Sequence, residues 1–174
     1  MEYVSFFETS FGTGVVLAGT TGIRRLHLPH VSTTQLIDSG EFSGLSSSAL
    51  TEDTAQMLTN YFKGERQRFE VVPVELILSG TFRVHVLQTI RSIPYGVVRS
   101  YGEVALLAGS PRSARAVGGA MAANPVPIII PCHRVISGNG RLTGYTAPGG
   151  LGMKKIVLQM EGVEFKGEVV CQEK

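Results

Sequence analysis

The sequence is poor in cysteine, in charge and in long apolar stretches. Only two of its 174 residues are cysteine, Cys132 and Cys171, which excludes a disulfide framework and, for these two alone, a zinc site. No apolar run approaches the roughly 18 residues that a membrane-spanning helix needs. The N-terminus has an acid at Glu2 and no basic flank, so we expect no secretory signal. These absences predict a protein of the cytoplasm, or of the nucleus in a eukaryote, with no membrane partner.

What the chain does contain is sufficient for a packed core. Hydrophobic residues make up 43% and charged residues 17%, a balance that excludes wholesale disorder. The charge is unevenly placed. Residues 1–79 carry five basic and nine acidic side chains, whereas residues 80–160 carry nine basic side chains and one acidic one. The basic region indicates either a polyanionic partner or a solvated basic face, and charge alone favours neither.

The first part of the chain reads as β-rich. Three runs enriched in Val, Phe and Thr predict strands over 3–9, 14–20 and 23–28. Residues 30–48 are rich in Ser, Thr and Gly and predict mostly loop. An apolar stripe at helical spacing covers 50–62 and ends at Gly64. Residues 69–80 look extended, with a domain junction near Ser79-Gly80.

The second half predicts short helices joined by tight turns. Ser100 and Glu103 have the spacing of a capping box, and Ser110-Pro111 has the pattern that begins another helix. Two short helices joined by a turn containing Gly109 are typical of a helix-turn-helix, a pattern that other helical hairpins share. An earlier helix stops at Pro94-Tyr95-Gly96.

The second of these paired helices, expected over 112–123, is unusually slim. It is rich in small residues, which include Ala116, Gly118, Gly119 and Ala122. Glycine inside a helix costs about 1 kcal/mol relative to alanine, so either tight helix packing or the close approach of an external body is expected there. Arg112 and Arg115, three residues apart, favour a nucleic-acid groove because guanidinium groups bind phosphates and stack on bases. A thin helix would fit even the minor groove, which is about 6 Å wide.

Together these patterns predict an α+β protein. We expect residues 1–79 to form a small N-terminal α/β domain, residues 80–165 a mostly helical, winged-helix-like domain with the helix-turn-helix, and residues 166–174 a tail. In the second domain three prolines flank an isoleucine triplet over 124–131, which predicts a stiff, extended, buried passage leading to Cys132.

A lone cysteine is most often a small buried apolar residue, and Cys171 is interpreted in this way. Cys132 differs because His133 and Arg134 adjoin it, and such neighbours favour a thiol pKa below about 8.5. In an extended chain adjacent side chains point to opposite faces. We therefore expect His133 to act on the sulfur through a kink or a water molecule. Glu161, near the end of the helix expected over 152–162, is either the acid that orients His133 or an exposed helix-end residue.

A glycine-rich loop over 137–150 has a hairpin signal at Asn139-Gly140. It lacks the Gly-Lys-Ser/Thr ending of a phosphate-binding P-loop. A small-molecule or base pocket that includes Tyr145, or a simple wing-like hairpin, fits this loop.

The segments ARAVGGAMAANPVPIIIPCHRVI and GRLTGY resemble the alkylguanine-DNA alkyltransferases, also called methylated-DNA–protein-cysteine methyltransferases. The resemblance covers residues 80–165. It implies DNA repair in which an alkyl group moves once and irreversibly from the O6 atom of guanine, flipped out of double-stranded DNA, to the protein's own cysteine. It also implies that the protein needs no cofactor. We further expect a monomer, and no structural metal because the N-terminal cysteines that bind zinc in some relatives are missing.

Residue roles follow from the same resemblance. The catalytic set is Cys132 as alkyl acceptor, His133, Glu161, Tyr101 as donor to the guanine, and Asn124. The DNA contacts are Arg115, which fills the space of the flipped nucleotide, with Arg112, Ala116, Gly118, Gly119 and Ala122. The substrate pocket comprises Met121, Pro127, Arg134, Tyr145, Thr146 and Lys154. The chain departs from the family near Ala122, where relatives often have a basic residue, so we expect one DNA contact to be weaker here.

Two other functions remain open on the residues themselves. Cys132 and His133 could serve a cysteine hydrolase through acyl transfer. The helix-turn-helix alone would suit a DNA-binding regulator without enzymatic activity. Transfer of an alkyl group to Cys132, once per molecule, distinguishes the first function from both.

Overall fold

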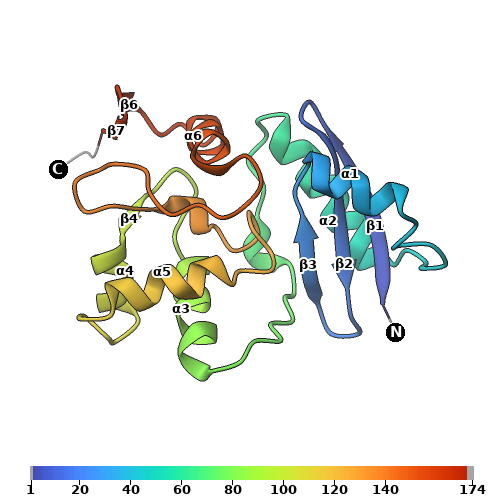
Figure 1. The fold of residues 1–174 in the computed structure, drawn as a ribbon, viewed down its shortest axis with the longest axis horizontal. Helices are drawn as coiled ribbons and strands as arrows, with labels where there is room; N and C mark the ends of the chain where they lie inside the picture. The colour runs from blue at the N-terminus through green and yellow to red at the C-terminus, as the bar shows by residue number, and fades with distance from the viewer. Residues whose placement is uncertain (1, 172–174) are drawn as a thin grey trace. The chain divides into compact units, whose positions relative to one another are not determined.

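The computed structural model describes residues 2–171 and divides into two compact units, Met1–Ile77 and Leu78–Lys174, where the sequence predicts a boundary after residue 79. The first unit is built on a sheet and the second mainly on helices (Figure 1), which confirms the α+β class. Within the described residues no helix is both long enough and apolar enough to cross a membrane.

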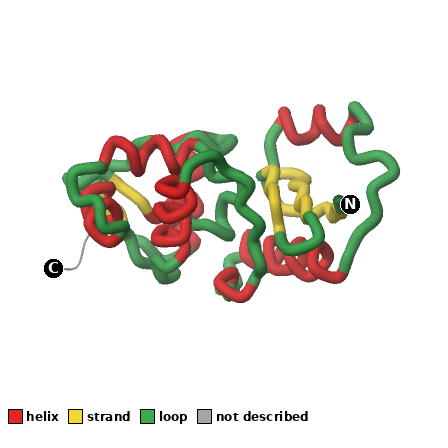
Figure 2. The backbone as a smooth tube through the Cα atoms, turned by 90° about the horizontal axis from the view of Figure 1, so that it is seen from below, coloured by secondary structure: helices red, strands yellow, loops and turns green. Residues whose placement is uncertain are grey.

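The first unit is a three-stranded antiparallel sheet between two helices. Its elements are β1 (Tyr3–Thr9), β2 (Gly12–Ala18), β3 (Ile23–His27), α1 (Val31–Asp38), α2 (Ala49–Phe62) and the 3-10 turn η1 (Phe69–Val71). Alternation along β1 sends Phe6 against Phe42 on one face and Phe7 against Phe62 of α2 on the other. The helices α1 and α2 cover opposite faces of the sheet (Figures 1 and 2). The three predicted strands and the helix over 50–62 are confirmed.

Two segments of this unit differ from prediction. Residues 30–48 contain α1, which begins where the His30 side chain accepts a hydrogen bond from the Ser32 amide. Only Thr33 of that helix is fully buried, so it lacks the apolar stripe that marks a helix in a sequence. The segment expected to be extended over 69–80 starts with η1, and only afterwards does Val74 pair with Ile23.

The second unit consists mostly of helices and loops (Figure 2). Its elements are α3 (Thr81–Arg91), β4 (Arg99–Ser100), α4 (Tyr101–Leu107), α5 (Ala114–Ala122), the 3-10 turn η2 (Cys132–Arg134), β5 (Val135–Ile136), α6 (Gly150–Met160), β6 (Phe165–Lys166) and β7 (Val169–Val170). The short strands β4 and β5 pair in parallel, and β6 pairs with β7 antiparallel. The parallel pair joins the start of α4 to the residues that follow η2.

The two helices α4 and α5 begin differently. The capping box of α4 is confirmed: Ser100 Oγ accepts from the Glu103 amide at 3.2 Å, and Glu103 Oε2 accepts from the Ser100 amide at 2.7 Å. The predicted start of α5 is wrong by two residues, because the Ser113 amide turns back to the Ser110 carbonyl before the helix begins. Arg112 therefore lies in this turn and not on the helix.

The segment expected to be a tail from residue 166 is paired in the structure. Val170 of β7 is buried, its amide donates to the Gly140 carbonyl at 3.0 Å, and Val169 pairs with Arg141. The β6–β7 hairpin thus packs against the Asn139-Gly140 turn, which the sequence predicts. Residues 172–174 of the expected tail lie outside the described residues.

The two helix starts predict a contrast in stability. Ser100→Ala removes the side chain that caps α4, and such losses lower the free energy of unfolding by about 1 kcal/mol. Ser113→Ala is the matched control, since Ser113 precedes α5 but makes no side-chain capping bond. Urea unfolding followed by circular dichroism measures both. Equal losses in the two variants would contradict the assigned cap.

Candidate active site

The chain reaches Cys132 through a tight turn and not through the extended passage that the sequence predicts. Pro127 pairs with Ile130, and the Ile130 amide donates to the Val126 carbonyl at 2.9 Å. Within this turn Ile128 has a φ of +72°, the left-handed region that β-branched residues rarely adopt. Such a conformation costs on the order of 1–3 kcal/mol. The prediction of burial is confirmed, because residues 126–136 are all buried.

Asn124 fixes this turn and contacts the sulfur. Its Oδ1 accepts from the Val126 amide at 3.1 Å, and its Nδ2 donates to the Ile130 carbonyl at 2.9 Å. The same Nδ2 lies 3.3 Å from Cys132 Sγ. One side chain at the end of α5 therefore sets the position of the sulfur relative to that helix.

The Cys132 side chain is only 5% exposed. Burial raises the pKa of its thiol, and this effect outweighs the hydrogen bond from Asn124 and the charge of Lys154, which both lower it. The expectation of a lowered thiol pKa is therefore wrong. The sequence shows the cationic neighbours of Cys132 but not the depth at which the sulfur lies.

His133 and Glu161 form a buried pair. His133 Nε2 lies 2.9 Å from Glu161 Oε1, while His133 Nδ1 has no hydrogen-bond partner among residues 2–171. Both side chains are fully buried, so of the two interpretations of Glu161 the exposed helix-end residue is excluded. Among the described residues no hydrogen bond joins the His133 imidazole to the Cys132 sulfur, because η2 turns about 120° per residue and spreads the two side chains apart. The backbone of His133 does hydrogen-bond to the thiol and lowers its pKa slightly.

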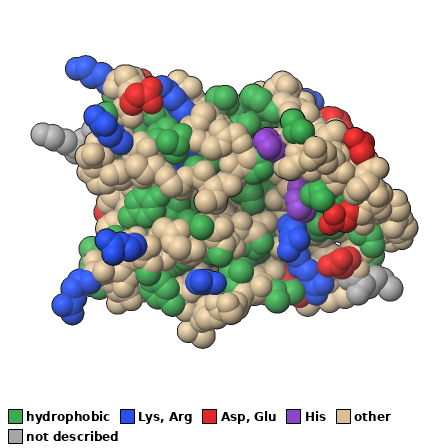
Figure 3. Space-filling view, viewed as in Figure 1, with side chains coloured by type: hydrophobic (Ala, Val, Ile, Leu, Met, Phe, Trp, Pro, Cys, Tyr) green, Lys and Arg blue, Asp and Glu red, His purple; other side chains and the backbone are tan. Residues whose placement is uncertain are grey.

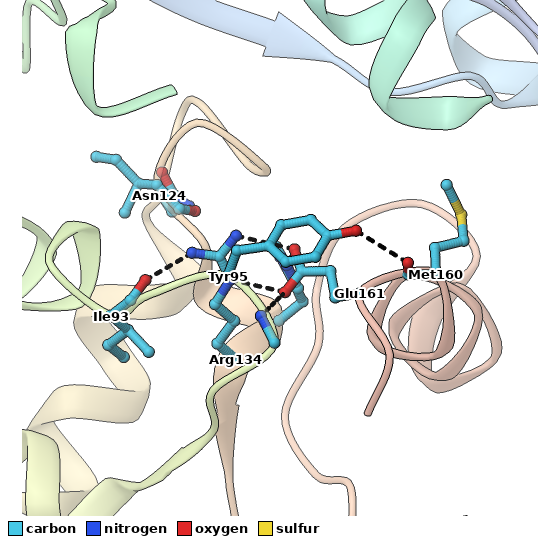
Figure 4. A network of polar contacts seen from close by, with 9 residues as sticks. Ile93, Tyr95, Asn124, Arg134, Met160 and Glu161 are labelled. Atoms are coloured by element: carbon cyan, nitrogen blue, oxygen red, sulfur yellow. Dashed lines mark hydrogen bonds and ion pairs between the residues drawn. The ribbon is translucent and has the colours of Figure 1, made fainter. Parts of the chain in front are cut away.

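Arg134 shares the same carboxylate. Its Nε donates to Glu161 Oε2 and its Nη2 to Glu161 Oε1, each at 2.9 Å, and its Nη1 donates to the Ile93 carbonyl at 2.6 Å (Figure 4). Burial raises the pKa of the Glu161 carboxyl, but the bonds and charges of His133 and Arg134 hold it well below its usual range. Burial lowers the pKa of His133, with Glu161 opposing the shift. The prediction that Arg134 lines the substrate pocket finds no support in these contacts, which all point to Glu161 and Ile93.

Four residues of this network escaped the sequence analysis: Ile93, Tyr95, Gly96 and Met160. The Gly96 amide donates to Glu161 Oε2 at 3.2 Å, and the Tyr95 hydroxyl donates to the Met160 carbonyl at 2.9 Å. The sequence did contain a signal, since Pro94-Tyr95-Gly96 is a helix stop of defined shape, but a stop does not indicate which distant residues it touches.

The loop after Thr143 joins the site through one carbonyl group. Lys154 Nζ donates to the carbonyl oxygens of Val135 at 2.6 Å and Thr143 at 2.8 Å, and the Tyr101 hydroxyl donates to Thr143 at 3.3 Å. A Cβ at Gly144 would lie within van der Waals overlap of the Tyr101 hydroxyl, so a glycine is needed for this approach. Burial lowers the pKa of Lys154 to about 8.

Of the other residues expected to line the pocket, Met121, Pro127 and Tyr145 are buried, and Thr146 is exposed. The Tyr145 ring lies 6.0 Å from Lys154 Nζ. Burial is the main cause that raises the pKa of Tyr145 well above its ordinary value, and the charge of the nearby Cys132 raises it further. The Tyr145 hydroxyl therefore stays protonated.

The outer face of α5 is exposed and carries small residues. Ala116, Gly119 and Ala122 are exposed, a Cβ at Gly119 would meet nothing within 4 Å, and one at Gly118 would make only an ordinary contact with the Tyr101 ring. Packing inside the protein therefore does not require these glycines. Arg112 and Arg115 are exposed, and Figure 3 shows basic side chains over α4 and α5 separated by apolar and backbone surface.

Comparison with known proteins shows what this arrangement is similar to. Residues 81–163 match the family model of the 6-O-methylguanine DNA methyltransferase DNA-binding domain. A methylated-DNA–protein-cysteine methyltransferase of Mycobacterium bovis is 42% identical over 154 residues, which are 88% of this chain and 84% of the relative. The constitutive enzyme of that name from Bacillus subtilis is 35% identical over 167 residues, 95% of this chain and 99% of the relative.

A solved structure agrees over nearly the whole chain. The crystal structure of Mycobacterium tuberculosis OGT in complex with DNA superposes with a TM-score of 0.73 at 32% sequence identity. The match covers 92% of that chain and 91% of this one.

The buried sulfur predicts a thiol that is protonated at neutral pH. In a Cys171→Ser background, thiolate absorbance near 240 nm should develop only above the ordinary thiol pKa of about 8.5, because burial penalises the charged form. The Cys132→Ser, Cys171→Ser double variant supplies the background from tyrosine ionisation. A thiolate already formed at pH 7 would contradict this prediction.

Proposed function

The chain belongs to the family of methylated-DNA–protein-cysteine methyltransferases, and on this premise we propose that it repairs DNA by moving the alkyl group of O6-alkylguanine to Cys132. The observation that carries the proposal is the position of the Cys132 sulfur. It is fixed by Asn124 at 3.3 Å, and Cys132 directly precedes His133, which forms a buried pair with Glu161. This is the arrangement that a cysteine needs if it is to lose its proton only during the reaction.

Double-stranded DNA would bind along the exposed face of α5. The absence of side chains at Gly118 and Gly119 leaves the backbone of this helix open to close approach. The O6 atom of guanine is inaccessible inside the base stack, so the nucleotide must be flipped out, at a cost of a few kcal/mol. Arg115, exposed near the start of α5, would fill the vacated space and offset part of that cost.

The alkyl transfer would begin with the proton on Cys132 Sγ. That proton would pass through a water molecule to His133 Nδ1, the nitrogen that has no partner in the described chain. Glu161 stabilises the imidazolium that forms, because it is held as an anion 2.9 Å from Nε2. The charge of Lys154 supports the thiolate.

The sulfur electron pair then forms a bond to the alkyl carbon while the carbon–O6 bond breaks. The departing guanine develops negative charge, and the Tyr101 hydroxyl, which donates to Thr143 before substrate binds, stabilises this charge as a hydrogen-bond donor. Protons are conserved in the reaction, because the proton that the thiol loses first is finally bound by the guanine ring. Met121, Pro127 and Tyr145 would form the apolar walls around the base, with Thr146 at the rim.

The product is a thioether on Cys132, which none of the residues placed at this site is equipped to hydrolyse. Each molecule would therefore act only once. We further propose that it needs no cofactor and that it acts on duplex DNA as a monomer. It would work where DNA is kept, in the cytoplasm of a bacterium or the nucleus of a eukaryote.

The decisive experiment follows the methyl group itself. Incubation with duplex DNA that contains radiolabelled O6-methylguanine should transfer at most one equivalent of label to the protein. Cys132→Ser should accept none, whereas Cys171→Ser, which changes an exposed cysteine, should accept a full equivalent. Turnover beyond one equivalent would indicate a hydrolase, and DNA binding without any transfer would indicate a regulator.

The flipping role of Arg115 predicts a difference between substrates. Arg115→Ala should slow methyl transfer from duplex DNA by about tenfold, equivalent to 1.4 kcal/mol, and leave transfer from free O6-methylguanine base nearly unchanged. Arg83→Ala, which removes an exposed arginine from α3, is the matched control for the loss of charge. Equal slowing on both substrates by Arg115→Ala would refute a role in flipping.

A further inference from the structure

The turn Ile93–Gly96, which follows α3, contacts the histidine–carboxylate cluster at both ends. At one end the Ile93 carbonyl accepts from Arg134 Nη1 at 2.6 Å. At the other end the Gly96 amide donates to Glu161 Oε2 at 3.2 Å. Gly96 has a φ of +75°, and a Cβ there would lie 2.9 Å from the Glu161 carbonyl oxygen. The turn approaches this closely only because residue 96 is a glycine.

Tyr95, in the middle of this turn, contacts Arg134 and the residue that precedes Glu161. Its ring centroid lies 5.8 Å from the guanidinium carbon of Arg134, within the range of a cation–π contact. Its hydroxyl donates at 2.9 Å to the carbonyl of Met160, the residue before Glu161 at the end of α6. Figure 4 shows the ring beside Arg134 and the hydroxyl directed at Met160. A helix stop requires neither of these contacts.

The charge of His133 depends on how fully Arg134 neutralises Glu161. Three charged groups face His133: Glu161 and Lys154 from α6, and Arg134 from η2, with Cys132 as its titratable neighbour. The helix α3 also packs against η2, and its fully buried side chains are all apolar. Because Arg134 donates to both oxygens of Glu161, the negative charge that would hold a proton on His133 is already compensated. A neutral imidazole is the form that can accept a proton.

We propose that Tyr95 is a positioning residue of the alkyl transfer: by holding Arg134 and the end of α6 together, it keeps His133 neutral until Cys132 gives up its proton. This role rests on the proposed function for the identity of the reaction. The contacts that carry it belong to the free protein, so it can be tested without DNA.

The test is the titration of His133 followed by NMR in protein labelled with ¹⁵N-histidine, with the resonance assigned by His133→Gln. Tyr95→Leu removes the ring and the hydroxyl, which loosens Arg134 and admits water. Both changes favour the imidazolium, so the pKa of His133 should rise by about one unit, a tenfold change in proton affinity. Tyr95→Phe keeps the ring over Arg134 and should give a clearly smaller rise. If Tyr95→Leu does not fold, Tyr95→Met is measured in its place, with the same expectation.

The rate of methyl transfer against pH gives the second readout. In Tyr95→Leu the acidic limb of the profile should move to higher pH by the same amount as the His133 titration. Transfer is then slowed at pH 6 and recovers as the pH rises. An unshifted His133 with a uniform loss of rate at every pH would overturn the positioning role. If the pKa of His133 rises in Tyr95→Leu while the wild-type protein accepts no methyl group, the positioning role is supported and the proposed function is refuted instead.

Discussion

The second unit depends on one buried carboxylate. Glu161 receives hydrogen bonds from the imidazole of His133, from two nitrogens of Arg134 and from the amide of Gly96. These donors come from η2 and from the turn after α3, while Glu161 itself ends α6. A charge buried this deeply is tolerated only when it is fully paired. The pairing therefore fixes three segments that are distant in sequence, and one of them, η2, carries Cys132, the proposed alkyl acceptor.

The burial that makes this pairing necessary also determines the reactivity of the sulfur. A thiol whose pKa is raised is a poor nucleophile toward electrophiles that merely diffuse past it, since the thiolate is the reactive form. A site that can act only once benefits from this restraint. In the proposed mechanism the proton moves when a base fills the pocket, and the neutral imidazole and the anionic carboxylate are already in place to receive it.

Local patterns in the sequence predict the elements well, whereas contacts between distant residues escape them. The strands of the first unit follow from runs of Val and Phe, and α4 follows from the spacing of Ser100 and Glu103. The helix α1 was missed because almost none of its side chains are buried. The low thiol pKa was predicted from cationic neighbours, but burial depends on the whole fold. The contacts of Tyr95 with Arg134 and Met160, and those of Arg134 with Glu161, join residues far apart in the sequence, and no spacing reveals them.

The left-handed conformation of Ile128 places a limit on how this protein can be stabilised. A glycine at that position would relieve the strain of a β-branched side chain at positive φ. It would also free the backbone of the unfolded and folded chain alike, four residues before the sulfur. The buried Ile128 side chain packs the turn that sets the placement of Cys132. Substitutions that relax the backbone at this turn would remove strain but would also hold Cys132 less firmly in position. Stabilising substitutions are therefore better sought on surfaces remote from this turn.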